Sequence, residues 1–476
     1  MNDLTTGSIP RHIVRLAVPM ALGMIFQTLY YLVDLYFVAR LGDAAVAGVS
    51  AAGNVQFIIM SFTQILGVST MALIAHAVGR KDQADANLVF NQSVLWAFVC
   101  GIGTLVVGYA LCGRYMSALG SNAETIAAGT SYLRWYIPGL ALQFALVSMG
   151  SALRGTGIVK PGMLVQMLTV VLNVVFAPIL IAGWGTGRPL GVAGAGLASS
   201  LAIGVGVIVM LLYFIRLEHY VAFRRELLGV RTDVLTRMLK IGVPPGAEFA
   251  LMFLFTAVIY TAIKPFGPEA QAGYGIGSRV MQSLFLPAMA VAFSAAPMAG
   301  QNMGAGHLDR VRDTFKWAAI MGSIPMALLT LFCQWRPELL VQGFTKETAV
   351  IAVASQFLGT ISWNFVATGL LFTCGGMFQA LGNTVPSLIA SGTRLLTCDR
   401  GVSLRGYTSA NAPGALAGSA TTLGSKSAPG YAAVACGDTI LASVTCPCFG
   451  VAASDVDRVA WFTTDSNVYV AQLTTG

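Results

Sequence analysis

The chain has 476 residues, of which 56% are hydrophobic and only 10% are charged, with a formal net charge of +8. A soluble domain is typically about one quarter charged, so this composition excludes an ordinary soluble multidomain protein. Apolar stretches of about 20 residues or more recur along the chain and predict membrane-spanning helices. A transmembrane β-barrel would instead show alternating segments of about ten residues, which this sequence lacks.

The apolar stretches predict ten complete spanning helices and the start of an eleventh. In the first half the helices are expected at residues 13–39, 45–77, 87–112, 124–153, 162–183 and 191–216. A basic linker at 217–239 follows, and the second half is expected to have helices at 241–264, 270–302, 312–334 and 347–379. An eleventh helix should begin near Pro386.

The second half repeats the first at a constant offset of 225 residues. The matching positions are Val18-Pro19 with Val243-Pro244, Gly42 with Gly267, Gly79 with Gly304, Gly157 with Gly382 and Pro161 with Pro386. One offset held over this length predicts two related halves that arose from one ancestral unit. Because each half has six helices, the two halves start on the same side of the membrane and form a parallel repeat.

Loop charges predict the orientation of the chain. With the N-terminus in the cytoplasm, the inside loops hold most of the basic residues, including Arg80, Lys81, the linker and Arg310. This is the bias that the positive-inside rule requires. The basic residues therefore indicate topology rather than nucleic-acid binding, and no removable signal peptide precedes the first helix.

These patterns predict an all-α polytopic membrane protein with two six-helix lobes in a parallel pseudo-two-fold repeat. The expected domains are an N-lobe at 1–216, a cytoplasmic linker at 217–239, an incomplete C-lobe at 240–396 and a tail at 397–476. Small residues at 191–206 indicate close helix packing. A glycine-rich phosphate loop is the competing interpretation of this stretch, but it lacks the lysine and the strand that such a loop needs.

The tail changes character abruptly after Leu396. The repeat predicts spanning helices at about 386–409 and 416–441, but the first window contains Asp399 and Arg400. A charge at bilayer depth costs at least about 2.5 kcal/mol on insertion scales, so a spanning helix is not expected there. A shifted reading frame, a fused foreign segment and a genuine soluble tail would each explain this change. The break inside an expected helix favours the first two, and we expect an aberrant, poorly ordered tail.

Two carboxylates, Asp34 and Glu248, lie inside clearly apolar predicted helices. A carboxylate in hydrocarbon must pair, bind a cation or stay protonated, because desolvation penalises its charged form. A cation-coupled carrier needs such a group. The competing interpretation is a hydrogen-bonded acid that only holds helices together.

Further polar residues in the helices complete the candidate site. Asn173 is a candidate cation ligand, and its alternative role is an interhelical hydrogen bond. Gln27, Tyr31, Tyr136 and Arg279 are candidates for a substrate cleft. Tyr136 could instead belong to an outer aromatic belt. Arg279 could instead pair with a carboxylate or extend toward the membrane surface. His76, at the end of the second helix, is expected to be a packing or interface residue rather than a proton relay.

No enzyme is predicted. The sequence has no nucleophile elbow, no zinc-protease helix and no Walker loop, and its four histidines form no ligand cluster. We therefore expect no cofactor and no metal site, with Na⁺ or H⁺ as the coupling ion. We also expect an ion gradient rather than ATP as the energy source.

Several motifs together resemble the multidrug and toxic compound extrusion (MATE) family, in particular its NorM-like branch. They are RLAVPMALGMIFQTLYYLVDLYFVARLG, GVSTMALIAHAVGRKD, AGYGIGSRV, APMAGQNMGAG and the pair SALRGTGIVKPG and GGMFQALGNTVPS. The resemblance covers about residues 8 to 396. It implies twelve helices in two lobes and the export of cationic or amphipathic drugs in exchange for Na⁺ or H⁺. Asp34 matches the family's first-helix aspartate, and Glu248 resembles the seventh-helix glutamate of the NorM-like branch.

The sequence departs from the family at three places. Many relatives carry an acid one turn after the fifth-helix asparagine, where this chain has Ala177 after Asn173. The tenth predicted helix lacks the acid that NorM-like members use, and the last two helices are missing. The first departure puts a proton switch centred on Asp34 in doubt.

The sequence therefore predicts a monomeric multidrug antiporter of the bacterial inner membrane, coupled to Na⁺ or H⁺ and working by alternating access, with no nucleic-acid partner. Two alternatives remain open at this point. A lipid-linked sugar flippase of the same superfamily would need a more basic cleft to meet pyrophosphate. A truncated or frameshifted product without transport activity is the other alternative, and the tail is the evidence for it.

Overall fold

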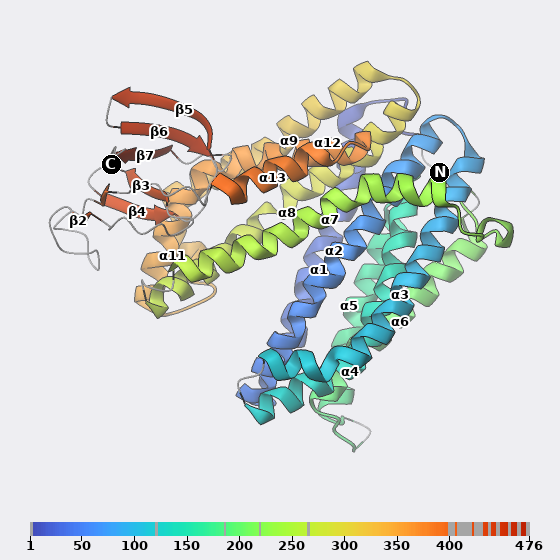
Figure 1. The fold of residues 1–476 in the computed structure, drawn as a ribbon, viewed down its shortest axis with the longest axis horizontal. Coiled ribbons are helices and arrows are strands. Elements are labelled where there is room, and N and C mark those ends of the chain that lie inside the picture. The colour runs from blue at the N-terminus through green and yellow to red at the C-terminus, as the bar shows by residue number, and fades with distance from the viewer. Residues whose placement is uncertain are drawn as a thin grey trace. The chain divides into compact units, whose positions relative to one another are not determined.

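The computed structural model describes residues 3–119, 122–184, 187–218, 220–263 and 267–397, and seven short strands between residues 405 and 472 (Figure 1). Only the backbone is described for residues 30–35, 43, 253, 257, 262, 268–269 and 393–397 and for the strands.

Six long helices form the first half of the chain. They are α1 (Ile9–Ala39), α2 (Asp43–Gly79), α3 (Gln83–Leu119), α4 (Ala123–Gly155), α5 (Lys160–Ile181) and α6 (Val192–Arg216). Local sequence signals mark several of their starts. Proline lies in the first turn of α1 and of α5, where its missing N–H costs nothing. The Asn122 side chain caps α4 by accepting the Thr125 N–H at 2.8 Å.

The second half contains more breaks than the sequence predicted. Its helices are α7 (Thr232–Ile263), α8 (Pro268–Gly304), α9 (Leu308–Trp335), α10 (Pro337–Val341), α11 (Thr348–Ile361), α12 (Phe365–Leu381) and α13 (Val385–Thr397). The single helix expected at 347–379 is interrupted by a 3-10 turn at Ser362–Asn364. Helix α7 begins at Thr232 rather than near residue 241, so the connection from α6 is shorter than expected.

The repeat at offset 225 is confirmed by where the helices begin. Helices α2, α3, α4 and α5 begin at Asp43, Gln83, Ala123 and Lys160, and α8, α9, α11 and α13 begin at Pro268, Leu308, Thr348 and Val385. Each start in the second group lies 225 residues after its counterpart. Ten helices of the described chain are long and apolar enough to cross a membrane. The protein is therefore a multi-pass helical membrane protein with two related halves.

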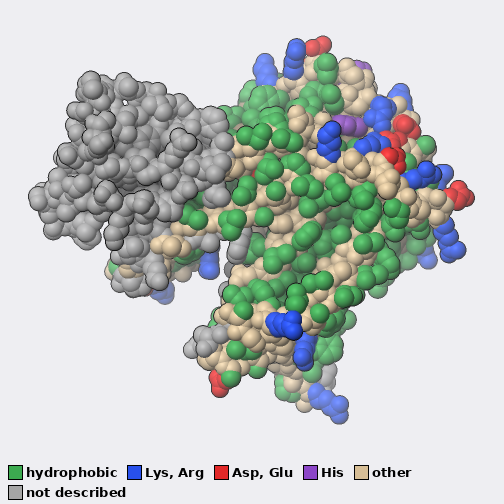
Figure 2. Space-filling model, in the orientation of Figure 1, with side chains coloured by type: hydrophobic (Ala, Val, Ile, Leu, Met, Phe, Trp, Pro, Cys, Tyr) green, Lys and Arg blue, Asp and Glu red, His purple; other side chains and the backbone are tan. Residues whose placement is uncertain are grey.

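The chain forms two compact units that do not follow the boundary between the repeats. Unit 1 comprises Met1–Ala250, Ala290–Ala318 and Gly376–Thr384, and unit 2 comprises Leu251–Met289, Ala319–Gly375 and Val385–Gly476. Unit 1 thus contains the first half together with one end of α7, α8, α9 and α12. Hydrophobic side chains cover much of the visible surface, while most visible Lys and Arg side chains lie toward the end with the N-terminus (Figure 2). We call the end of unit 1 that carries Arg80, Lys81 and Arg310 the basic end.

The core of unit 1 depends on aromatic packing and on small residues. Phe90 of α3 stacks on Phe214 of α6 with ring centroids 4.8 Å apart, and both side chains are buried. Gly196 of α6 lies so close to α4 that an added Cβ would overlap the carbonyl oxygen of Tyr132. The predicted close packing of the small residues at 191–206 is therefore confirmed.

The segment between α6 and α7 is held against α3 by buried amide side chains. Asn87 donates to the Tyr220 carbonyl at 3.0 Å and accepts the Ala222 N–H at 2.8 Å. Asn91, one turn later, donates to the Ala222 carbonyl and accepts the Arg224 N–H. These contacts satisfy alternate backbone groups of an extended chain in the way that a neighbouring strand would. The segment is therefore fixed to the first half by ordered hydrogen bonds.

The last helix, α13, ends at Thr397, close to the change in sequence at Leu396. The described parts of the tail are β1 (Arg405–Gly406), β2 (Thr421–Thr422), β3 (Ala432–Cys436), β4 (Thr439–Ser443), β5 (Cys448–Asp455), β6 (Arg458–Thr463) and β7 (Val468–Gln472). They pair antiparallel as β1-β2, β3-β4 and β5-β6-β7. The part of the tail between these strands lies outside the described residues.

Candidate functional site

Asn173 is the predicted site residue whose surroundings are most fully described. It lies on α5 with a side chain that is 0% exposed, and its Nδ2 donates to the Ser199 hydroxyl of α6 at 3.1 Å. Its Oδ1 is buried and has no hydrogen-bond partner in the described part of the chain. An amide oxygen buried in this way costs free energy unless a donor or a cation reaches it. Asn173 therefore offers an unused acceptor inside the first half.

The helix that carries Asp34 packs directly beside α5. Residues of α1 contact residues of α5 within unit 1. The positions of Asp34 and Tyr31 lie on the described backbone of α1, but both side chains lie outside the described residues. Gln27, about two turns before Asp34, is half-buried on the same helix.

Ala177 occupies the position at which many relatives carry an acid. Its side chain is 0% exposed, and it lies one helical turn after Asn173 on α5. Any negative charge for a cation here must come from another helix.

Tyr136 forms a buried relay of hydrogen bonds that the sequence did not reveal. Its hydroxyl donates to Gln56 Oε1 at 2.7 Å, and Gln56 Nε2 donates to Gln143 Oε1 at 3.1 Å. Tyr136 is 6% exposed and Gln56 7% exposed, so both lie inside the packed first half. Gln143 is the only polar residue in the apolar stretch Leu140–Val147, and that isolation is the signal which could have identified it.

Glu248 and Arg279 belong to different units of the chain. Glu248 lies on the part of α7 that belongs to unit 1, is half-buried and has an interaction partner. Arg279 lies on α8 within unit 2, and its side chain is exposed. Their assignment to the cation site and the substrate cleft therefore stays a prediction.

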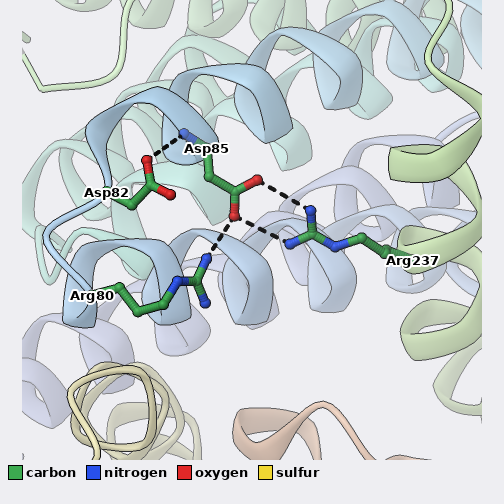
Figure 3. A network of polar contacts seen from close by, with 4 residues as sticks. All are labelled: Arg80, Asp82, Asp85 and Arg237. Atoms are coloured by element: carbon green, nitrogen blue, oxygen red, sulfur yellow. Dashed lines mark hydrogen bonds and ion pairs between the residues drawn. The ribbon is translucent and has the colours of Figure 1, made fainter.

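A second polar cluster lies at the basic end and was not predicted. Arg237 of α7 makes a paired contact with the Asp85 carboxylate of α3, at 3.1 and 3.2 Å, and Arg80 donates to the same carboxylate at 2.7 Å (Figure 3). The Asp82 side chain accepts the Asp85 N–H at 3.0 Å. These charges connect helices of the first half to the first helix of the second half.

Comparison with known proteins identifies a pattern that covers most of the helical part. The MatE family pattern matches residues 19–179 and 244–398. The two matches begin 225 residues apart, at the same offset as the repeat.

Individual relatives are distant but extensive. The chain is 24% identical over 382 residues to a probable multidrug resistance protein, YoeA, of Bacillus subtilis, covering 78% of this chain and 82% of that protein. It is 25% identical over 370 residues to the multidrug export protein MepA of Staphylococcus aureus, covering 77% and 80%.

Solved structures share the fold. One is a multidrug resistance MATE family transporter in an outward-facing conformation, with a TM-score of 0.77, 24% identity, and coverage of 83% of this chain and 88% of that one. Another is a MOP superfamily transporter from Pyrococcus furiosus, with a TM-score of 0.76, 23% identity and coverage of 83% and 88%. At this level of identity the likeness concerns the arrangement of the helices.

Proposed function

Because the chain belongs to the MatE family of membrane transporters, and is therefore not an enzyme, we propose that it is an efflux antiporter for cationic or amphipathic compounds. The exchanged ion is Na⁺ or H⁺, and the membrane is the cytoplasmic membrane of a bacterial-type cell. The names of the YoeA and MepA relatives support multidrug export. The loop charges support an N-terminus in the cytoplasm, with the basic end on that side.

The observation that carries the coupling proposal is the unused oxygen of Asn173. This Oδ1 is buried without a partner in the described chain, on the helix next to the one that carries Asp34. A protonated Asp34 could donate to it, and Na⁺ could bind both oxygens. The Asp34 carboxylate supplies the charge that Ala177 does not. Asp34 and Asn173 thus form the proposed cation site of the first half.

The cation and the compound are expected to differ in their affinity for the inward-open and outward-open states of the transporter. A ligand shifts a conformational equilibrium only through its different affinity for the two states. We propose that the compound enters from the cytoplasmic side and that cation binding at Asp34 from outside releases it. Glu248 serves as a second acid for the cation or for a cationic compound. Gln27, Tyr31, Tyr136 and Arg279 are the proposed residues of the compound's path.

A reconstituted transport assay tests this proposal. Purified protein in liposomes would export a cationic dye against its gradient when a Na⁺ or H⁺ gradient is imposed, and each ion is tested separately. Asp34→Asn and Asn173→Leu should reduce ion-driven efflux at least about tenfold, which corresponds to about 1.4 kcal/mol. Glu248→Gln should also reduce it, while Asp313→Asn, which changes an exposed acid of α9, is the matched control.

The outcomes separate the alternatives that the sequence left open. Equal efflux in all the acid variants would end the coupling proposal. Transport of a lipid-linked pyrophosphate sugar, with no movement of dye, would support the flippase. A folded protein that moves neither would support a product without transport activity. Thermal unfolding of each variant shows whether a loss of efflux reflects a loss of folding.

A further inference from the structure

The ends of α2 and α8 cross at the basic end through two glycines that are repeat counterparts. A Cβ added at Gly79 would overlap the carbonyl oxygen of Gln301, and a Cβ added at Gly304 would overlap the carbonyl oxygen of His76. Residues 79 and 304 are related by the offset of 225, and so are residues 76 and 301. The crossing is therefore the same contact made twice, once from each half. All four residues belong to unit 1.

Two hydrogen bonds repeat the same symmetry. His76 Nε2 lies 2.7 Å from the carbonyl oxygen of Ala380 in the last turn of α12. Gln301 Nε2 donates to the carbonyl oxygen of Gly155, the last residue of α4, at 3.0 Å. Residues 155 and 380 are again 225 apart. His76, in the first half, thus binds the end of α12 in the second half. Gln301, in the second half, binds the end of α4, the equivalent helix of the first half.

These bonds satisfy groups that a helix cannot satisfy by itself. The last carbonyls of a helix have no intrahelical donor and need a partner from elsewhere. The Ala380 carbonyl can only accept, so His76 Nε2 carries a proton in this contact. Gln301 is 0% exposed and His76 is half-buried, so the Gln301 bond is shielded from water and the His76 bond is partly shielded. Separation of the two halves at this end would expose both carbonyls together.

Further polar contacts between the two halves lie at the basic end. They involve the repeat counterparts Asp85 and Arg310, which differ in charge. Asp85 of the first half binds Arg237 of the second half, as Figure 3 shows. Its repeat counterpart, Arg310 of the second half, donates to the Gly7 carbonyl of the first half at 3.1 Å. The counterparts Asp85 and Arg310 thus each contact the other half, one through an ion pair and one through a charge-assisted hydrogen bond.

The N-terminal segment adds contacts on one side of the crossing. The Leu4 N–H donates to Gln301 Oε1 at 3.0 Å, Asn302 donates to the Leu4 carbonyl at 3.2 Å, and the Leu4 side chain is 2% exposed. On either side of Leu4, Thr5 and Asp3 also interact. The Thr5 hydroxyl and N–H both donate to the Asp3 carboxylate, and these bonds hold the pKa of Asp3 below its ordinary value. Gln301, on α8, therefore also binds the N-terminal segment and α4. The described hydrogen bond of His76 reaches α12 alone.

We propose that this crossing is the closed form of the transporter's gate at the basic end. Gly79 and Gly304 set the closest approach of the halves, and His76 and Gln301 hold it as two equivalent bonds that open together. Gln301 is the stronger of the two because it also holds Leu4. This proposal rests on the alternating-access transport proposed above, in which this end must open once in each cycle.

The test measures the opening directly. Two spin labels are placed at Ala84 and Asp309, exposed repeat counterparts at the starts of α3 and α9, through a noncanonical amino acid that leaves the eight native cysteines in place. Pulsed distance measurements in lipid nanodiscs then report the ratio of open to closed protein. Gly79→Ala and Gly304→Ala should each raise this ratio about tenfold, because the added methyl groups meet backbone atoms that cannot move aside cheaply. Gly53→Ala on α2, where a Cβ meets nothing within 4 Å, controls for the higher helix propensity of alanine.

The hydrogen bonds are tested in the same labelled protein. His76→Gln keeps a donor and should preserve the closed population, whereas His76→Leu should raise the open-to-closed ratio about fivefold. Gln301→Leu should raise it more than His76→Leu, and deletion of residues 2–5 should remove that difference. Unchanged distances in both glycine variants, or an equal shift in Gly53→Ala, would overturn the proposal. Longer distances without any dye efflux would support the gate and argue against the proposed substrate instead.

Discussion

Asn91 Oδ1 accepts the backbone N–H of Arg224 at 2.8 Å, so a side chain of α3 fixes the segment that connects the two halves. Asn91 is 0% exposed and also donates to the Ala222 carbonyl at 2.9 Å. The connection therefore moves with the first half. Any hinge between the halves must lie after it, toward the start of α7.

Asn91→Ala should release this segment without unfolding the helices. The Arg224 N–H and the Ala222 carbonyl would lose their partners, at a local cost of about 1–3 kcal/mol. Hydrogen exchange at residues 220–231 should become about tenfold faster or more. Ser117→Ala, which removes an exposed hydroxyl bonded within the same helix, should leave this exchange unchanged. Equal protection in the two variants would show that the amides do not hold the segment.

Asn173→Leu should separate stability from transport. The change removes a buried oxygen that has no partner in the described chain, together with the bond to Ser199. These two effects oppose each other, so the free energy of unfolding should change by less than about 1 kcal/mol. The concentration of coupling ion needed for half-maximal efflux should rise about tenfold. A large loss of thermal stability would instead show that Asn173 has a structural role.

Tyr136→Phe should weaken the first half through the Gln56 relay. The variant leaves Gln56 Oε1 without the phenol donor in a buried position, which costs about 1–3 kcal/mol and should lower the melting temperature. Tyr109→Phe removes a bond from an exposed tyrosine to the Arg134 carbonyl and should have a much smaller effect. If Tyr136 also lines the compound's path, its variant will change the KM for dye, and Tyr109→Phe will not. Equal melting temperatures in the two variants would contradict the importance of the relay.

Two glycines of α6 offer a matched test of helix packing. Gly196→Ala places a methyl group against the Tyr132 carbonyl and should destabilise the protein by about 1–3 kcal/mol. Gly204→Ala meets only the end of the Leu142 side chain at 3.7 Å and should be neutral or slightly stabilising. Thermal unfolding in detergent with size-exclusion detection compares them. The packing argument fails if the two variants melt alike.

The sequence was sufficient to predict the parts of the fold that depend on apolar length and on the repeat. The ten spans and the offset of 225 are both found in the structure. The short helix α10 and the break at Ser362–Asn364 were missed, because an apolar stretch does not show where a helix is interrupted. The start of α7 was placed too late because its first turns are polar.

The site was predicted less completely, for a physical reason. A carboxylate in an apolar helix is conspicuous, so Asp34 and Glu248 could be selected from the sequence alone. The bonds of Asn87, Asn91 and Gln301 join side chains to backbone groups more than 100 residues away, and no spacing rule predicts them. His76 was expected to be an interface residue, and its bond to the Ala380 carbonyl confirms this.

The doubled contact at Gly79 and Gly304 also bears on how such a protein could have arisen. A two-fold interface is self-complementary, so one short gene product could have closed this end by pairing with a second copy of itself. In such a homodimer the side chains at the positions of His76 and Gln301 would have been identical. Fusion of the two copies let these positions diverge, and the present chain has an imidazole at one and an amide at the other. Of the two equivalent positions, the one occupied by His76 now has a side chain that can take up a proton, and the one occupied by Gln301 does not.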